Sequence, residues 1–105
     1  MLDPNEIYHK LTEAGNDWAD KQAAHNVLDD TKNSVLAKLM LKSAAPSVAA
    51  REIEAKASEE YENHVRATQE AFKDALKARV KYDSMRVWVD LKRSEEASRR
   101  AEMKL

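Results

Sequence analysis

The residues best suited to chemistry are three histidines, His9, His25 and His64. Glu6 and His9 have the Glu-x-x-His spacing with which helical bundles bind pairs of iron ions, but such sites need two of these motifs and two further glutamates. The chain contains no second Glu-x-x-His, and Glu6 is also expected to cap a helix. We therefore expect no metal site and no cofactor.

The sequence also lacks the turns on which enzymes place nucleophiles and phosphates. A single glycine in 105 residues leaves no glycine-rich phosphate loop, and serine, histidine and aspartate occur without a nucleophile elbow. Long helices provide few of the concave pockets that enzymes use. We therefore predict that the protein is not an enzyme and has no catalytic residues. The absence of cysteine excludes disulfides and agrees with a reducing cytoplasm, where we expect the protein to act.

Binding of nucleic acid is an alternative function, because the last third of the chain is basic. Residues 73–105 hold 10 Lys and Arg against 6 Asp and Glu, a net charge of +4, with Tyr82 and Trp88 interleaved as a stacking surface would require. The sequence pI is only about 6.3, however, whereas that of dedicated nucleic-acid domains exceeds about 9. The candidate contacts are Arg86, Lys92, Arg93, Arg99 and Arg100.

A further alternative is that acidic side chains mimic a nucleic acid and inhibit a nuclease or another enzyme that binds nucleic acid. Runs of charge more often form solvated surfaces, so this hypothesis ranks below the basic one. The candidate residues are Asp17, Asp20, Asp29, Asp30, Glu52, Glu54, Glu59, Glu60 and Glu62.

The elements that position these residues are predicted to be helices. Asp3 is the expected N-cap of the first helix, with Pro4 in its first turn and Glu6 completing a capping box. Leu2 and Ile7 have the spacing of a hydrophobic staple. This agreement of several signals predicts a helix that begins at Pro4.

The apolar spacing continues to residue 42, as one helix or a helix pair over 4–42. Gly15 is either a C-cap that ends a first helix or a point of close packing within one bent helix. The segment 43–47 is a predicted turn, because Pro46 disfavours helix at the preceding residue and Ser47 is a good N-cap.

From Ser47 onward the chain contains no glycine or proline, which predicts one long helix over 48–104, or a short and a long helix divided near Ser58. Its apolar face is wide, which is more typical of a bundle helix than of a two-stranded seam. We expect a single all-α domain, an antiparallel helical hairpin with a long C-terminal helix.

Such a hairpin would leave apolar residues uncovered. Val87, Trp88 and Val89 point around most of a helical turn, whereas one neighbouring helix covers only one side. Assembly into a coiled-coil-like bundle, with a homodimer favoured over binding to an unknown protein, would cover them. The predicted interface consists of Leu76, Val80, Tyr82, Met85, Val87, Trp88 and Leu91.

The N-terminal sequence Met-Leu-Asp-Pro has no basic segment followed by an apolar run, so we expect no signal peptide. The apolar stretch Val35–Leu41 is interrupted by Lys38 and is too short to span a bilayer, so we expect no membrane contact.

Two segments, Ala14-Gly15-Asn16-Asp17-Trp18-Ala19-Asp20 and Arg93-Ser94-Glu95-Glu96-Ala97-Ser98-Arg99-Arg100-Ala101-Glu102-Met103, resemble small all-helical proteins encoded by phages and prophages. Such proteins often accompany replication and recombination genes. The resemblance implies an accessory or inhibitor role and assigns no site residue. The leading hypothesis is a non-enzymatic, homo-oligomeric protein–protein interaction module of phage origin.

Overall fold

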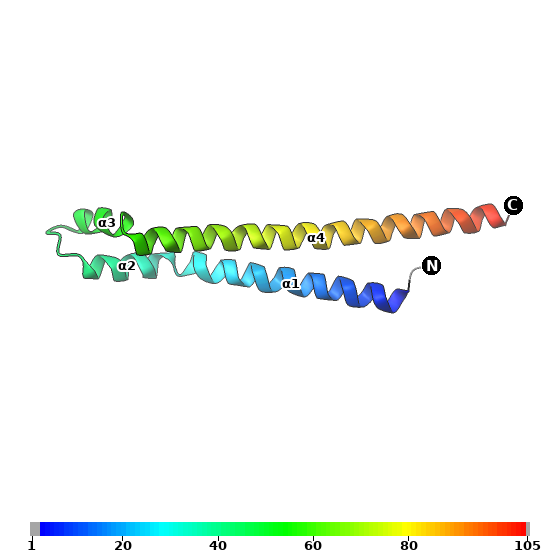
Figure 1. The fold of residues 1–105 in the computed structure, drawn as a ribbon, viewed down its shortest axis with the longest axis horizontal. Helices are drawn as coiled ribbons and strands as arrows, with labels where there is room; N and C mark the ends of the chain where they lie inside the picture. The colour runs from blue at the N-terminus through cyan, green and yellow to red at the C-terminus, as the bar shows by residue number, and fades with distance from the viewer. Residues whose placement is uncertain (1–2, 105) are drawn as a thin grey trace. The chain divides into compact units, whose positions relative to one another are not determined.

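The computed structural model describes residues 3–104. This part of the chain contains helices and no strand, which confirms the prediction of an all-α protein. The last helix is 45 residues long, so the predicted long C-terminal helix is present. In chain order the helices are α1 (Pro4–Asp30), α2 (Lys32–Lys42), α3 (Val48–Lys56) and α4 (Glu59–Met103) (Figure 1).

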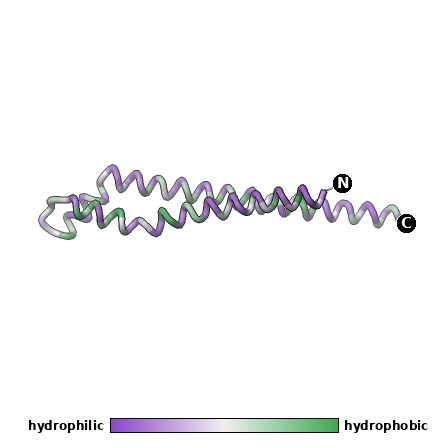
Figure 2. Tube along the Cα trace, turned by 90° about the horizontal axis from the view of Figure 1, so that it is seen from below, coloured by the Kyte–Doolittle hydropathy of each residue, from purple (hydrophilic) through white to green (hydrophobic). Residues whose placement is uncertain are grey.

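The chain divides into two compact units. The terminal unit consists of residues 1–20 and 75–105, and the middle unit consists of residues 21–74. The long helices α1 and α4 each contribute one end to each unit. Hydrophilic and hydrophobic residues alternate along both helices, as the colouring of Figure 2 shows. The antiparallel hairpin and its assembly into a bundle stay predictions.

The start of α1 shows the expected cap. The backbone N–H of Asn5 donates to Oδ1 of Asp3 over 3.0 Å, and the N–H of Ile7 donates to the Asp3 carbonyl oxygen over 3.0 Å. Asp3 therefore satisfies donors of the first turn. The Glu6 carboxylate, predicted to close a capping box, lies 3.0 Å from Nζ of Lys10, one turn further along. Leu2 of the expected staple lies outside the described residues.

The first break in the helical chain falls at Thr31 and not at Gly15. In the middle unit, the Leu28 carbonyl oxygen accepts from Oγ1 of Thr31 at 3.2 Å and lies 2.9 Å from Nε2 of His64. Because a carbonyl oxygen only accepts hydrogen bonds, Nε2 of His64 is the donor. These side-chain bonds occupy a carbonyl that a continuous helix would direct to the N–H of Lys32, and α1 ends there.

The connection between α2 and α3 is held by hydrogen bonds from side chains. Oγ of Ser43 donates to Oε2 of Glu54 over 2.8 Å, and Nε of Arg51 donates to the Ala45 carbonyl oxygen over 2.8 Å. Ser47 has extended backbone angles, and its Oγ accepts from the N–H of Ala50 at 3.1 Å. Ser47 is thus the N-cap of α3.

A second serine separates α3 from α4. Oγ of Ser58 donates to the Ala55 carbonyl oxygen over 2.6 Å and accepts from the N–H of Tyr61 at 3.3 Å. One hydroxyl therefore satisfies the last turn of α3 and the first turn of α4. Of the two alternatives for 48–104, the structure has the short helix followed by the long one.

Replacing Ser47 by Ala should lower the free energy of unfolding by about 1 kcal/mol, because the N–H of Ala50 loses its acceptor. Urea denaturation followed by circular dichroism measures this change. Ser34→Ala, at an exposed position within α2, is the matched control and should leave stability nearly unchanged. An equal loss in both variants would show that Ser47 is not an effective cap.

Candidate association surface

Within the terminal unit, α4 is packed on one side by the first part of α1. The buried residues of this contact are small: Ala14 from α1, and Ala75, Ala78 and Val89 from α4. Among the described residues no large side chain is fully buried. Small side chains allow two helices to approach closely but remove little apolar area from water, so this contact uses only a small part of the apolar surface of α4.

Gly15 belongs to this contact. A Cβ atom built at Gly15 would lie 3.6 Å from Cε2 of Tyr82, and no described glycine has a positive φ angle. Gly15 is therefore an ordinary helical residue facing the Tyr82 ring. Of the two sequence-based alternatives, the structure has the close-packing one.

Aromatic and arginine side chains extend the contact between α1 and α4. The ring centroids of Trp18 and Tyr82 are 5.8 Å apart. The guanidinium of Arg79 lies 5.8 Å from the Trp18 ring, and that of Arg86 lies 5.9 Å from the Tyr82 ring. Aromatic pairs contribute about 0.5–1.5 kcal/mol beyond their burial, and exposed cation–π contacts about 0.5–1 kcal/mol. Tyr82, predicted as part of the interface, thus faces α1.

The remaining apolar residues of this part of α4 lie on its other side. At about 100° per residue, Leu76, Val80, Val87 and Leu91 fall within roughly 60° of the helix circumference, centred about 160° from the buried residues. Their exposed fractions are 44%, 63%, 58% and 64%, so nothing in the chain covers them. We call these four residues the outer stripe. Sequence periodicity located them but did not separate them from the inner face.

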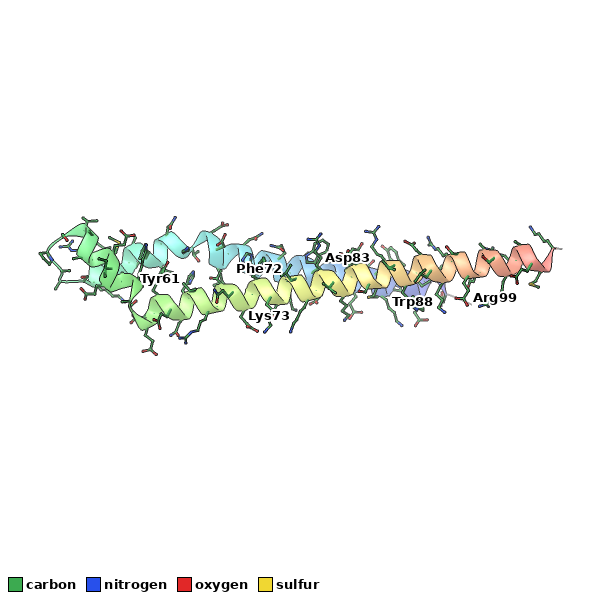
Figure 3. All side chains as sticks on the ribbon, turned by 90° about the horizontal axis from the view of Figure 1, so that it is seen from above. Tyr61, Phe72, Lys73, Asp83, Trp88 and Arg99 are labelled. Carbon is green, nitrogen blue, oxygen red and sulfur yellow. The ribbon has the colours of Figure 1, made fainter. Side chains whose placement is uncertain are left out.

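Trp88 and Met85 occupy a third position. They line a groove of about 280 Å³ within the terminal unit, where Trp88 is 50% exposed and Met85 is partly buried. Trp88 lies on α4 beside the outer stripe, as its label in Figure 3 allows the reader to follow. The other lining residues are Ile7, Lys10, Leu11, Lys81, Ser84 and Val89. The seven predicted interface residues therefore divide among the outer stripe, the α1 contact and this groove.

The basic candidate residues divide between two sides of α4. Arg79, Arg86, Arg93 and Arg100 recur every seven residues, so they form one row that shifts by only about 20° per step. Lys92 and Arg99 lie about 100° away from that row. These two contact Glu95, with Nζ of Lys92 at 3.3 Å and Nη2 of Arg99 at 2.8 Å (Figure 3).

Hydrogen bonds from Lys92 and Arg99 hold the pKa of the Glu95 carboxyl below its ordinary value. Its carboxylate is the charged partner of both cations, which reduces the field that Lys92 and Arg99 present to an anion. Arg93 and Arg100 are exposed, and among the described residues they form no ion pair. The arginine row is therefore better placed than Lys92 and Arg99 to meet an anionic ligand.

The acidic candidates are dispersed over several helices. Glu52 lies 2.9 Å from Nζ of Lys56, Glu62 lies 3.7 Å from Nη2 of Arg66, and Glu54 accepts the hydrogen bond from Ser43. Exposed pairs of this kind contribute about 0–1 kcal/mol each and stabilise local structure. Nothing in the structure favours these residues as an inhibitory surface over a solvated one.

The histidines are engaged separately. The His9 ring lies edge-on to Tyr8 with 5.7 Å between centroids, His25 lies 5.2 Å from the Phe72 ring, and His64 bonds to Leu28. Within residues 3–104 no three potential ligand side chains are grouped to hold a metal ion.

None of the helices in the described residues combines the length and hydrophobicity that crossing a membrane requires.

Comparisons of the chain with protein-family models, with curated proteins and with solved structures found no match.

Gly15→Ala should stabilise the protein by about 0.5–1 kcal/mol. Alanine has the higher helix propensity, and its methyl group would meet Tyr82 at ordinary van der Waals distance. Chemical denaturation of the two proteins measures the difference. Loss of stability would mean that Tyr82 approaches Gly15 more closely than the 3.6 Å found here.

Proposed function

We propose that the protein is a non-enzymatic interaction module that associates with a second copy of itself through the outer stripe of α4. The observation that carries the proposal is the exposure of four aliphatic side chains along the side of α4 that α1 does not cover. Complete burial of one such side chain contributes roughly 1.5–3 kcal/mol, so covering the stripe would supply several kcal/mol towards association.

The total surface supports this proposal. The chain exposes 8195 Å², whereas a compact globular monomer of 11.9 kDa would expose about 5,900 Å². The difference, about 2,300 Å², is of the order of the 1,200–2,000 Å² that a stable interface buries from both partners together. The chain therefore has ample surface for a partner.

The net charge supports a second copy as that partner. At pH 7 the chain carries a formal charge of −1, so two copies repel each other only weakly. The charges are unevenly distributed along the chain, which allows oppositely charged parts of two copies to meet.

Val80→Glu should convert the assembly to a monomer, because it places a carboxylate in the centre of the interface, where burying an unpaired charge is costly. Light scattering after size-exclusion chromatography measures the mass. Val27→Glu is the matched control, since Val27 of α1 is 61% exposed and Val80 is 63% exposed. An unchanged mass for Val80→Glu, or equal dissociation by both variants, would contradict the proposal.

A second candidate function is the binding of nucleic acid by the arginine row. Arg93 and Arg100 are exposed at seven-residue spacing, which sets them about 10 Å apart along the helix. Guanidinium groups bind phosphate through paired hydrogen bonds. The exposure of these two residues favours this candidate over one based on Lys92 and Arg99.

If this candidate function is correct, Arg93→Ala/Arg100→Ala should weaken binding of short single- or double-stranded DNA and should reduce the dependence of affinity on salt by about two phosphate contacts. Fluorescence anisotropy at several salt concentrations measures both. Lys32→Ala/Lys38→Ala, with two exposed cations of α2, is the charge-matched control and should leave affinity nearly unchanged. Absence of binding by the unmodified protein at low salt would exclude this function.

A further inference from the structure

The outer stripe is self-complementary when read in opposite directions. Leu76 and Leu91 are equidistant from the peptide bond between Asp83 and Ser84, and Val80 and Val87 are also equidistant from it. Two copies of α4 placed antiparallel about this bond would match leucine with leucine and valine with valine. Such a residue arrangement suits a two-fold interface, in which the same surface patch is used by both copies.

The stripe also stays on one side of the helix. Leu76 and Val87 are 11 residues apart, as are Val80 and Leu91. A repeat of 11 residues corresponds to about 3.67 residues per turn, close to the 3.6 of a straight α-helix. Two such stripes can therefore remain in contact from Leu76 to Leu91, over about 22 Å.

The charges along one edge of the stripe distinguish the two possible directions. This edge carries alternating signs, because Arg79, Asp83, Arg86 and Asp90 all lie roughly 50–110° to the same side of the stripe centre. In an antiparallel pair this edge faces its own copy reversed. Arg79 then lies within about 3 Å of the level of Asp90 in the other copy, and Asp83 lies equally close to the level of Arg86.

A parallel pair in register would place this edge against the opposite edge of the stripe, which carries Lys77, Ser84, Trp88 and Glu95. Arg79 would then meet Lys77, and Asp90 would lie between Trp88 and Glu95. Opposite charges would not meet, and like charges would approach each other. Complementary charges set orientation more than affinity, so this difference selects the antiparallel direction.

Within the described chain, the charges of this edge are only partly satisfied. Nε of Arg79 lies 3.7 Å from Oδ2 of Asp83, and Arg79 also contacts Trp18. Arg86 contacts the Tyr82 ring, and Asp90 forms no ion pair among residues 3–104. Asp90 and Arg86 are therefore available for a partner that presents the opposite charge.

From these observations we propose that two copies associate as an antiparallel α4–α4 pair with a two-fold axis near the bond between Asp83 and Ser84. This inference rests on the proposed function, because it assumes that the outer stripe mediates self-association. It adds the direction, the register and the ion pairs, Arg79 with Asp90 and Asp83 with Arg86 of the second copy.

Spin-label distances in the full-length protein test this arrangement. The chain contains no cysteine, so Ser84→Cys and Ser98→Cys, both at exposed positions of α4, each carry a single label without further changes. Ser84 lies close to the proposed axis, whereas Ser98 lies far from it. Pulsed electron paramagnetic resonance measures the distance between labels on the two copies.

The antiparallel pair predicts a short distance for the Ser84→Cys label and a separation of about 43 Å along the helix for the Ser98→Cys label. Short distances for both labels, set by an interhelical spacing of about 8–10 Å, would overturn the antiparallel inference while leaving the proposed function intact. A long distance at Ser84→Cys, or no distance between copies for either label, would overturn both.

Discussion

The structure depends on one geometric constraint: a single neighbouring helix covers only one side of an α-helix. In the terminal unit, α1 covers the side of α4 that carries Ala75, Ala78 and Val89. The outer stripe lies on the opposite side and stays in water. A fold of this kind separates two tasks along one helix, with one side for the chain's own packing and the other free for a partner.

The small size of the buried residues reinforces this separation. Alanine side chains, with Gly15 facing Tyr82, bring the helices close together, but the hydrophobic stabilisation from burying them is small. Side-chain hydrogen bonds and the contacts among Trp18, Tyr82, Arg79 and Arg86 add to it. A chain stabilised in this way gains from association, because a partner that binds only the folded state raises stability by mass action.

Local signals in the sequence specified several features of the fold. The caps at Asp3 and Ser47 were predictable because capping depends on a residue and its immediate neighbours. The break at Thr31 was not predicted, because it involves His64, which is 33 positions away in the sequence. Gly15 left two alternatives open for the same reason, since its neighbour Tyr82 comes from a distant segment.

The candidate surface shows a similar limit. Hydrophobic periodicity identified the apolar residues of α4, but it treated Leu76, Tyr82 and Trp88 as one surface. The tertiary contacts place Tyr82 against α1 and Trp88 at a groove, and only the exposed fractions distinguish the outer stripe. The arginine row likewise became distinct from Lys92 and Arg99 once Glu95 was found between those two cations.

The most direct test of the central claim is the mass of the unmodified protein by sedimentation equilibrium, measured over a range of concentrations at low and at high salt. Association through the outer stripe predicts a dimer of about 24 kDa that persists at high salt, because apolar burial is not screened by ions. A mass of 11.9 kDa at every concentration and salt would contradict the account.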